Sequence, residues 1–563
     1  MYRSRQHARL RESPLGDSAR CQQFVSLPLF GCIASPYRKQ QRRKEPNTVD
    51  CQDEVSSPQS PRAEDLTQTQ IRGSSLLLGG RLLSLGINFC AQVLMVRYLS
   101  VAHYGALAYG LSVVAFLQLF ATLGLQEAIS RYVPVYYEKG EYDKLFGTIL
   151  FAAGVIFGTG ILVVATVVGA PGFLAHVMTH ERLALRLLPI LIFLVPVEAA
   201  DAMLDGLFAS FASTRSIFFR KYILGPGLKL GVVVLLIWRN ATVVFLAYGY
   251  VAASISGVLM YSWMYLLLLK GQQLLGHIKP RLIKIPTREI LSFIVPGLSS
   301  ILATVAISTI SIFLLGSIRT MSDVAYFRAV LPLAQLNSVV MASFTLLYTP
   351  SAARLLASAD HSAVSQLYWR TAAWMSVLSF PIFAMTFSLA QPLTVFLYGA
   401  RYEHAAPILA VLSFGSYFNV ALGFNVQTLK VIDSLHYVTA MSVVCVLLNV
   451  VLNLALIPRF GAVGAAIGTA GSLIIYNLLM QMGLLNASNL KAFERNYLSI
   501  YVTIALSAAG LFSLQFFRFV SIYVALPIAG CVSLFVFASA KKKLKPTEVF
   551  PELLSLPFAR LLT

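Results

Sequence analysis

Charged residues are scarce in this chain. They make up 12% of its 563 residues, whereas soluble globular proteins carry roughly 25%. Hydrophobic residues make up 57%, and the mean hydropathy is +0.72. About 20 apolar residues suffice for one helix to cross a bilayer, and apolar runs of this kind follow in quick succession from residue 74. The composition excludes a soluble multidomain protein and predicts a chain that spans a membrane many times.

Motifs for metal, nucleotide or disulfide chemistry are also missing. The six cysteines show no CxxC or paired spacing, and the eight histidines form no HExxH motif. Without such motifs we expect no metal and no cofactor. No nucleotide-binding loop is present either, so the expected energy source is an ion gradient or the substrate gradient. After residue 73 the gaps between apolar runs are under 25 residues. No soluble catalytic domain fits into them, and we expect a protein that is not an enzyme.

A net charge of +20 raises the question of nucleic acid. The basic residues lie in short gaps between apolar runs and form no patch, which argues against such a partner. When successive loops are assigned to alternate sides, 20 basic residues lie on one side and eight on the other. Arg220 and Lys221 belong to the larger set. Because positive charge stays on the side of synthesis, we expect both termini in the cytoplasm.

The apolar runs predict an all-α polytopic membrane protein of about fourteen transmembrane helices. Two six-helix bundles are joined by a cytoplasmic, hinge-like linker and followed by two further helices. The start of the chain is rich in Arg, Gln, Ser and Pro, which predicts either a disordered cytoplasmic tail or an over-extended start. The expected parts are 1–73 (tail), 74–269 (first bundle), 270–289 (linker), 290–484 (second bundle), 485–540 (two helices) and 541–563 (basic cytoplasmic tail).

An internal repeat supports two bundles of the same orientation. Arg97 to Ser100, four residues before Tyr104, recurs as Arg319 to Ser322, four residues before Tyr326. Both copies fall between the first and second helix of their set, at an offset of 222 residues. An even number of helices in each repeat relates the halves by an axis along the membrane normal.

Six ionisable side chains fall inside the expected spans, where each costs about 2.5–3.5 kcal/mol or more and so asks for a function or a partner. They are Arg81, Glu198, Asp201, Asp205, Lys229 and Arg328. The three acids are spaced i, i+3, i+7, on one helix face. In one interpretation they line a wet cavity, where Arg81, Lys229 and Arg328 bind an anionic substrate and the carboxylates relay H⁺ or Na⁺. In the other, they neutralise one another as ion pairs between helices. Two further interpretations stay open. Asp205 lies close to the cytoplasmic end of its expected helix, where it would be at the membrane surface. Arg328 lies near the outer end of its helix, from where its side chain would extend outward to water.

Helix-breaking residues lie beside these charges. Gly225-Pro226-Gly227 precedes Lys229, Pro189 and Pro196 flank the acidic helix, and Pro296-Gly297 lies early in the second bundle. A distorted helix exposes backbone groups that a membrane tolerates only beside a cavity. The pattern indicates a central site in the first bundle.

Three stretches resemble the multidrug/oligosaccharidyl-lipid/polysaccharide exporter superfamily, and within it the polysaccharide flippase (Wzx-like) branch. The first contains Val96 to Ser100, Tyr104-Gly105, Gly124-Leu125 and Arg131 to Pro134. The second contains Leu397 to Gly399, Tyr402, Ala405 to Pro407 and Leu409. The third runs from Asn449 to Pro458, then Phe460-Gly461 and Gly464 to Ala466.

The resemblance implies a flippase of the bacterial cytoplasmic membrane. Its substrate would be an undecaprenyl-pyrophosphate-linked oligosaccharide for surface polysaccharide or O-antigen, and its partners that lipid and the bilayer. Three alternatives stay open: a cation-coupled drug or metabolite antiporter of the same superfamily, a lipid-linked peptidoglycan-precursor flippase, and a membrane sugar polymerase or ligase.

Overall fold

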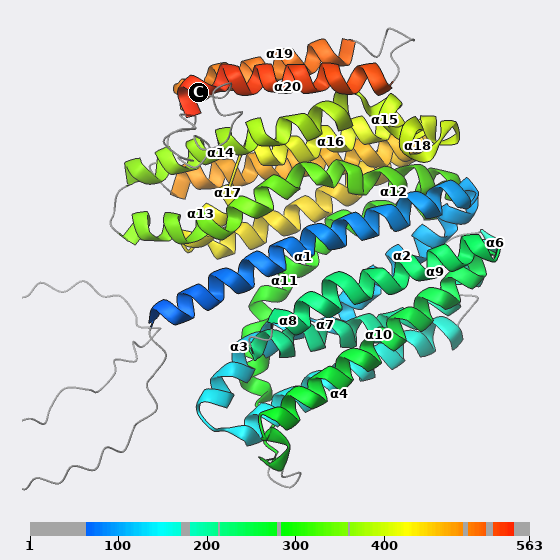
Figure 1. Ribbon diagram of the computed structural model, residues 1–563, viewed down its shortest axis with the longest axis vertical. Helices are drawn as coiled ribbons and strands as arrows, with labels where there is room; N and C mark the ends of the chain where they lie inside the picture. The colour runs from blue at the N-terminus through cyan, green and yellow to red at the C-terminus, as the bar shows by residue number, and fades with distance from the viewer. Residues whose placement is uncertain are drawn as a thin grey trace, which may run out of the picture. The chain divides into compact units, whose positions relative to one another are not determined.

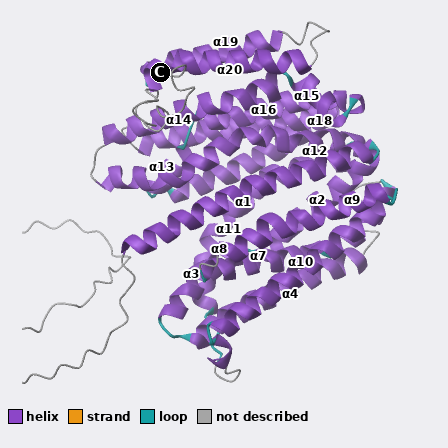
Figure 2. Cartoon of the chain, viewed as in Figure 1, coloured by secondary structure: helices purple, strands orange, loops and turns teal. Residues whose placement is uncertain are grey.

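The computed structural model describes residues 63–169, 181–211, 214–277, 283–357, 361–487, 494–513 and 522–544. All regular structure in these ranges is helical, with no strand among them (Figure 2), which confirms the all-α expectation. Every described residue belongs to one compact unit, which begins at Ala63. The expected tail up to residue 62 and most of the basic tail, residues 545–563, lie outside the described residues.

The first nine labelled α-helices and one π-helix form what we call the N-terminal half. It is built from α1 (Ala63–Tyr98), α2 (Val101–Thr122), α3 (Leu125–Glu138), α4 (Tyr142–Gly169), α6 (Arg182–Leu191), α7 (Leu194–Ser210), α8 (Thr214–Ile217), the π-helix η1 (Phe218–Leu224), α9 (Gly225–Trp238) and α10 (Val243–Gly271). A short 3-10 turn, η2 (Leu274–His277), follows α10.

The C-terminal half follows the linker. It comprises α11 (Thr287–Ile318), α12 (Met321–Gln335), η4 (Leu336–Ser338), α13 (Val339–Ala357), α14 (His361–Phe383), η5 (Ala384–Ser388), α15 (Ala390–Tyr398), η6 (Ala400–Ala405), α16 (Ala406–Ala421), α17 (Asn425–Val431) and α18 (Leu435–Ala487). After η7 (Arg495–Tyr497), α19 (Leu498–Ser513) and α20 (Ile522–Leu544) lie side by side against the C-terminal half (Figure 1).

The first helix begins earlier than the apolar run suggests. α1 starts at Ala63 rather than near residue 75. The added residues include Ala, Glu, Leu and Gln, which all favour a helix. As a stretch, they are not apolar enough to be recognised as a membrane span. Hydropathy therefore locates the membrane-embedded part of this helix and misses its polar beginning.

Within the described residues, 11 helices are long and apolar enough to cross a membrane, or 12 if the bent pair α6 and α7 forms one span. One of the 11 is α18, whose 53 residues contain non-helical backbone at Gly461, with φ 57° and ψ −134°. Positive φ is a conformation that glycine adopts readily. Pro458 precedes this break, so that one helix ends near Pro458 and another starts after Gly461. The number fourteen stays a prediction.

Both ends of the helical unit lie on the same side of the molecule. Figure 1 shows the start of α1 and the end of α20 at the same end of the helices, on the left. An even number of crossings produces this arrangement. Many large apolar side chains are exposed, among them Ile161, Leu162, Leu259, Leu447, Leu506 and Leu534. Such side chains suit contact with lipid tails, which are as apolar as Leu.

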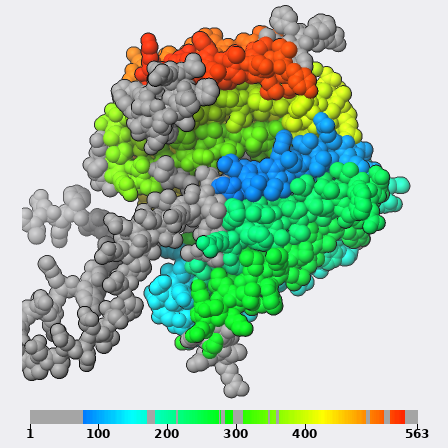
Figure 3. Space-filling model, in the orientation of Figure 1, coloured from blue at the N-terminus to red at the C-terminus, as the bar shows by residue number. Residues whose placement is uncertain are grey.

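α1 runs between the two halves, as the blue band in Figure 3 shows. The halves also touch directly through α2, which packs against α11 and α12. A Cβ added to Gly105 would overlap the carbonyl oxygen of Met321, and one added to Gly316 would overlap the ring of Tyr109. These glycines therefore allow the halves to approach closely at the end of the molecule where α1 finishes.

The linker is partly fixed to the N-terminal half. The backbone N–H of Lys284 donates to the carbonyl oxygen of Asp143 at 3.3 Å. A Cβ on Gly147 in α4 would overlap the carbonyl of Lys284. The expected hinge within 270–289 is not tested by these contacts, but its last residues are held against α4.

Candidate functional site

The acidic row lies on α7, beside a bend. α6 and α7 meet at an angle of 42°, with Pro189 inside α6 and Pro196 at the start of α7. Proline removes a backbone donor and disturbs the preceding helical turn. The bend occurs where the sequence predicts a distortion, and Glu198, Asp201 and Asp205 follow it.

The opposing basic residues come from a distorted helix. η1 has π-helical bonding that ends in an i→i−5 bond from the Gly225 N–H to the Arg220 carbonyl, and Pro226 follows at the first turn of α9. π-turns of this kind are rare and concentrate at functional sites. The sequence predicts a break or kink at Gly225-Pro226-Gly227. The structure instead has a π-turn just before it, in one continuous span, Arg215–Trp238.

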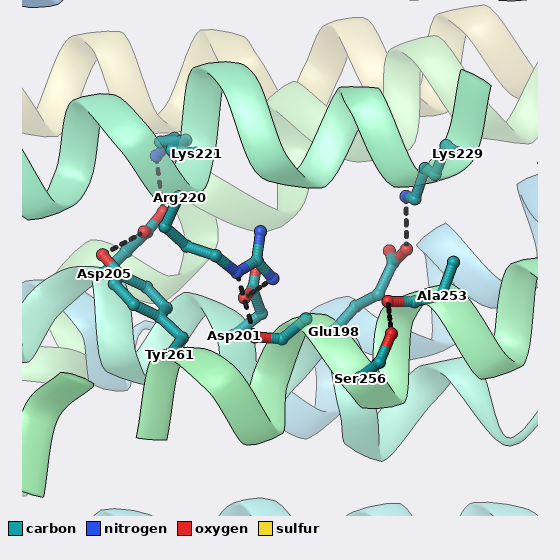
Figure 4. A network of polar contacts seen from close by, with 10 residues as sticks. Glu198, Asp201, Asp205, Arg220, Lys221, Lys229, Ala253, Ser256 and Tyr261 are labelled. Carbon is teal, nitrogen blue, oxygen red and sulfur yellow. Dashed lines mark hydrogen bonds and ion pairs between the residues drawn. The ribbon is translucent and has the colours of Figure 1, made fainter. Parts of the chain in front are cut away.

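Three ion pairs join α7 to η1 and α9, as Figure 4 shows. Arg220 pairs with Asp201. Lys221 Nζ lies 2.6 Å from Asp205 Oδ2, and Lys229 Nζ lies 3.1 Å from Glu198 Oε1. Each carboxylate of the row thus has its own cation on the facing helix.

Arg220 is enclosed by the protein, with its side chain only 7% exposed. Besides Asp201, its Nε donates to the carbonyl oxygen of Gly257 at 3.1 Å, and its guanidinium lies 5.3 Å from the ring centre of Tyr261. Added Cβ atoms on Gly225 and Gly257 would lie 2.7 Å and 3.0 Å from the guanidinium. Two glycines therefore make the space for this arginine, and the pair with Asp201 is built into the packing.

The other two pairs are wetter. The side chain of Lys229 is 37% exposed and that of Glu198 31%, while Lys221 is 45% exposed. Asp205 is more enclosed, at 13%, and accepts a second hydrogen bond from the Tyr261 hydroxyl at 3.1 Å. Lys229 and Lys221 can therefore exchange their carboxylates for another anion more easily than Arg220 can.

These pairs line a cavity of about 460 Å³. All three acids and all three bases contribute to its wall, together with polar side chains of α1, α2, α3 and α10: Ser84, Asn88, Gln118, Gln126 and Ser254. The charges on this wall are paired with one another and also face a cavity. Their roles in binding and coupling stay predictions.

A second cavity, of about 160 Å³, lies next to the first, and Asn88 and Lys229 line both. Its wall includes Arg328 from α12, with Gln92, Tyr104 and Tyr250. Arg328 is half-buried and faces this space rather than the outer surface. It places a cation of the C-terminal half beside one of the N-terminal half.

Arg81 lies elsewhere, in a third cavity of about 390 Å³ between α1, Tyr222 and the start of α13. Its side chain is exposed, and no ion pair connects it to another residue in the part of the chain that the structure describes. The pairing of Arg81 with the acidic row, one of the two sequence-based interpretations, is not seen. Each of those carboxylates has a different partner.

Sequence reasoning missed Arg220 and Lys221 as site residues, because it counted them among the cytoplasmic loops. The structure places both inside a membrane-spanning helix. Without them 18 basic residues remain on the inward side against eight, so the expected orientation does not change. A usable signal existed: three acids on one face require three cations, and the nearest basic residues precede the Gly-Pro-Gly segment.

The C-terminal half has a polar cluster of a different kind, which joins α11 to α18. Asn449 donates to Ser472 Oγ at 2.7 Å, and Asn453 donates to Ser311 Oγ at 3.1 Å. The Thr469 hydroxyl donates to Ser311 Oγ at 2.8 Å. Both asparagines are fully buried. An added Cβ on Gly468 would lie 3.1 Å from the Asn453 amide, so small residues let these helices approach, as the sequence predicts for Gly461 to Gly471.

Metal coordination finds no support in the residues described, where no three His, Cys, Asp or Glu side chains form a group able to hold an ion.

The family described as polysaccharide biosynthesis protein matches residues 94–407. An uncharacterized membrane protein of Methanocaldococcus jannaschii is 22% identical over 446 residues, which cover 76% of this chain and 85% of that protein.

Solved structures give similar folds. Lipid II flippase MurJ, in an inward closed conformation, has a TM-score of 0.61 at 17% identity, covering 84% of this chain and 99% of that one. An inward-facing multidrug resistance MATE family transporter of the MOP superfamily has a TM-score of 0.56 at 14% identity, covering 72% and 95%. At such low identity these likenesses show the fold, a polytopic bundle of the exporter type.

Proposed function

The chain belongs to the polysaccharide biosynthesis protein family, and from this premise we propose that it is a flippase that moves a lipid-linked oligosaccharide across the membrane. The substrate would be an undecaprenyl-pyrophosphate-linked oligosaccharide, destined for surface polysaccharide or O-antigen. The resemblance at Val96 to Ser100 and at Asn449 to Pro458 agrees with this family.

One observation carries the proposal: Lys229 of the N-terminal half and Arg328 of the C-terminal half line the same cavity. A pyrophosphate carries fixed negative charge that a membrane interior excludes. Arginine is always charged and its planar fork binds phosphate oxygens in two places. An anion between the two cations would contact both halves, so its binding would depend on how the halves are arranged. Such dependence is what alternating access requires.

Arg81 would act earlier on the same route. Its cavity lies between α1 and α13, at the boundary of the two halves, where a lipid could present its head group while its chain stays in the bilayer. Arg81, Asn88 and Gln92 follow one another along α1, and they line the third, first and second cavities. The three cavities thus form a polar series along one helix.

The acidic row would couple transport to a cation. Glu198 neutralises Lys229 when no substrate is present. An anionic substrate that takes over Lys229 leaves this carboxylate without its partner, and H⁺ or Na⁺ would then compensate the charge. Asp205 would act similarly through Lys221, whereas Asp201 is committed to the enclosed Arg220.

Flipping by the full chain in proteoliposomes tests the proposal. A pyrophosphate-linked oligosaccharide lipid with a fluorophore on its sugar is protected from dithionite only in the inner leaflet. We expect Arg328→Ala to slow its exchange by about tenfold or more, the effect of losing one charge-assisted hydrogen bond. Arg239→Ala is the control, because Arg239 lies outside all three cavities, over the Trp238 ring. Equal rates for Arg328→Ala and the unaltered protein would contradict the proposal.

A cation-coupled drug or metabolite antiporter is the second candidate, favoured by the row of three carboxylates on the cavity wall. It predicts uptake of a cationic solute driven by a H⁺ or Na⁺ gradient, with no exchange of the pyrophosphate lipid. A flippase for a peptidoglycan precursor would accept a lipid carrying the muramyl peptide instead. A sugar polymerase or ligase would lengthen the glycan, which we do not expect.

The proposal includes the site of action. We place the protein in the bacterial cytoplasmic membrane with both termini in the cytoplasm. Reporters fused after Ala540 and within 270–289 are expected to indicate the cytoplasm, and one at Arg401 the outside. Two ends on opposite sides would contradict this orientation.

A further inference from the structure

Two arginines bind each other's helix ends where the halves meet. Arg97, in the last turn of α1, donates through Nε to the carbonyl oxygen of Leu397 at 2.7 Å and through Nη2 to that of Phe396. Arg401, in η6, donates through Nη2 to the carbonyl oxygens of Val96, at 2.6 Å, and Arg97. These bonds join residues about 300 positions apart. We call this pair the arginine clasp.

The clasp uses the chemistry of helix ends. α1 ends at Tyr98 and α15 at Tyr398. The last carbonyl groups of a helix have no partner within it and carry partial negative charge. Each arginine supplies the missing donors to the other's segment, and its positive charge complements the helix end. Both arginines are exposed, so each bond competes with water and contributes modestly. Such bonds can break and re-form.

Further contacts close the same end. Gln92 of α1 and Tyr398 of α15 both donate to the carbonyl oxygen of Ala329, each at 2.8 Å. Gly105 of α2 also lies against the carbonyl group of Met321 in α12. Along α1, the polar cavities are lined by residues from Leu77 to Met95, and the clasp begins at Arg97. The cavities therefore stop where the clasp starts.

The internal repeat supplies a comparison. Arg319 occupies the position in the second repeat that Arg97 occupies in the first. It too donates to the end of a helix, but to the carbonyl oxygens of Ile457 and Pro458, within its own half. The equivalent arginine thus stabilises one half internally, whereas Arg97 connects the two halves.

We propose that the arginine clasp holds this end of the molecule, which the topology predicts to face outside, closed against the cavities and releases it as a unit during transport. The inference rests on the proposed function only in that transport requires this end to open. Neither arginine lines any of the three cavities described above, so in this proposal their role is to set the balance between the closed and open arrangements.

Distance measurement between the halves tests the clasp without any substrate. Spin labels at His103 and Glu403, in the full chain with its native cysteines replaced, report the separation across this end. We expect Arg401→Ala and Arg97→Ala each to increase the ratio of long to short distances by about tenfold, which corresponds to about 1.4 kcal/mol. Arg319→Ala, the matched control, should leave the ratio unchanged. Gly105→Ala should also open this end, with both arginines intact.

Two results would overturn the clasp: distances in Arg97→Ala and Arg401→Ala that match the unaltered protein, or opening in Arg319→Ala as large as theirs. The lipid-exchange assay on the same variants separates this outcome from the proposed function. A clear distance change in a protein that exchanges no pyrophosphate lipid would leave the clasp standing and reject the flippase. Normal exchange with no distance change would do the reverse.

Discussion

In the N-terminal half, full charges connect α7 to η1 and α9, whereas in the C-terminal half α11 and α18 are joined by amides and hydroxyls. The carboxylates Glu198 and Asp201 are about one-third exposed, at 31% and 32%. Asn449 and Asn453 are fully buried. Charges are thus found beside a cavity that admits water, and neutral groups where helices exclude it.

This difference follows from solvation. Burying an unpaired charge costs far more than burying a hydrogen-bonded amide. Neutral side-chain hydrogen bonds between membrane helices contribute about 0.6 kcal/mol on average, so the amide cluster can join helices without requiring a cavity. A pair of charges keeps the capacity to bind an external ion. Under the proposed function, we expect the charged residues to bind substrate and the cluster of Ser311, Asn449 and Asn453 to act as a scaffold.

The enclosed pair offers the strongest way to break this contrast. Arg220→Met leaves Asp201 without its cation, and we expect it to destabilise the protein by about 3 kcal/mol, the lower end of the range for breaking a buried pair, because Asp201 is 32% exposed. Thermal unfolding in detergent measures the loss. In the double variant Arg220→Met/Asp201→Leu no unpaired charge remains, so its melting temperature should return close to the original. A single variant as stable as the double would show that this pair is not enclosed as described.

The amide cluster should give a smaller effect. Asn453→Leu removes the bonds to Ser311 and Asn449, while the Ser311 hydroxyl keeps its bonds to Asn449 and Thr469. We expect a loss of about 1 kcal/mol, the net contribution of an ordinary hydrogen bond, with lipid exchange reduced only in proportion to the folded protein. Thr166→Val is the control, because that hydroxyl is exposed, bonds to a carbonyl group of its own helix α4 and lines none of the three cavities. Loss of exchange in fully folded Asn453→Leu would mean that the cluster takes part in transport.

Arg81 should have the smallest effect on stability and a large one on export. Having no ion pair among the described residues, it should change the free energy of unfolding by less than about 0.5 kcal/mol when replaced by alanine. We expect Arg81→Ala to abolish export at a normal protein level, and Arg81→Lys to restore it partly. Neutralising Glu198, Asp201 or Asp205 should not rescue the alanine variant, since each already has a cation. Normal export by Arg81→Ala would contradict the binding role.

Much of the fold could be predicted from the sequence, because the membrane requires what hydropathy detects. Long apolar runs give the helices, and Pro189, Pro196 and Gly461 mark distortions that the structure confirms. The start of α1 at Ala63 was not predicted, because a polar helix in water has a composition similar to that of a polar tail. The number of spans also depends on whether α18, which is broken at Gly461, is counted once or twice.

The candidate site was predictable on one side only. The spacing of Glu198, Asp201 and Asp205 places them on one face without further information. Their partners were not predictable, because Arg220 stands at the beginning of a span, where basic residues usually mark the cytoplasmic side. The arginine clasp joins residues about 300 positions apart, and no local pattern in a single sequence indicates such a contact.

The π-turn η1 sets the directions in which the basic side chains point around the helix axis. Nine residues separate Arg220 from Lys229, and in an uninterrupted α-helix nine residues make two and a half turns. The two side chains would then point to opposite sides, and only one could face α7. The wider turn of η1 takes up an extra residue and brings both toward the acidic row. A single-residue deletion in Phe218–Leu224 would leave hydropathy and charge nearly unchanged. If the deleted residue lies between Lys221 and Gly225, eight residues then separate Arg220 from Lys229, which is about 800° of regular α-helix, so the two side chains would stay about 80° apart and both could still face α7.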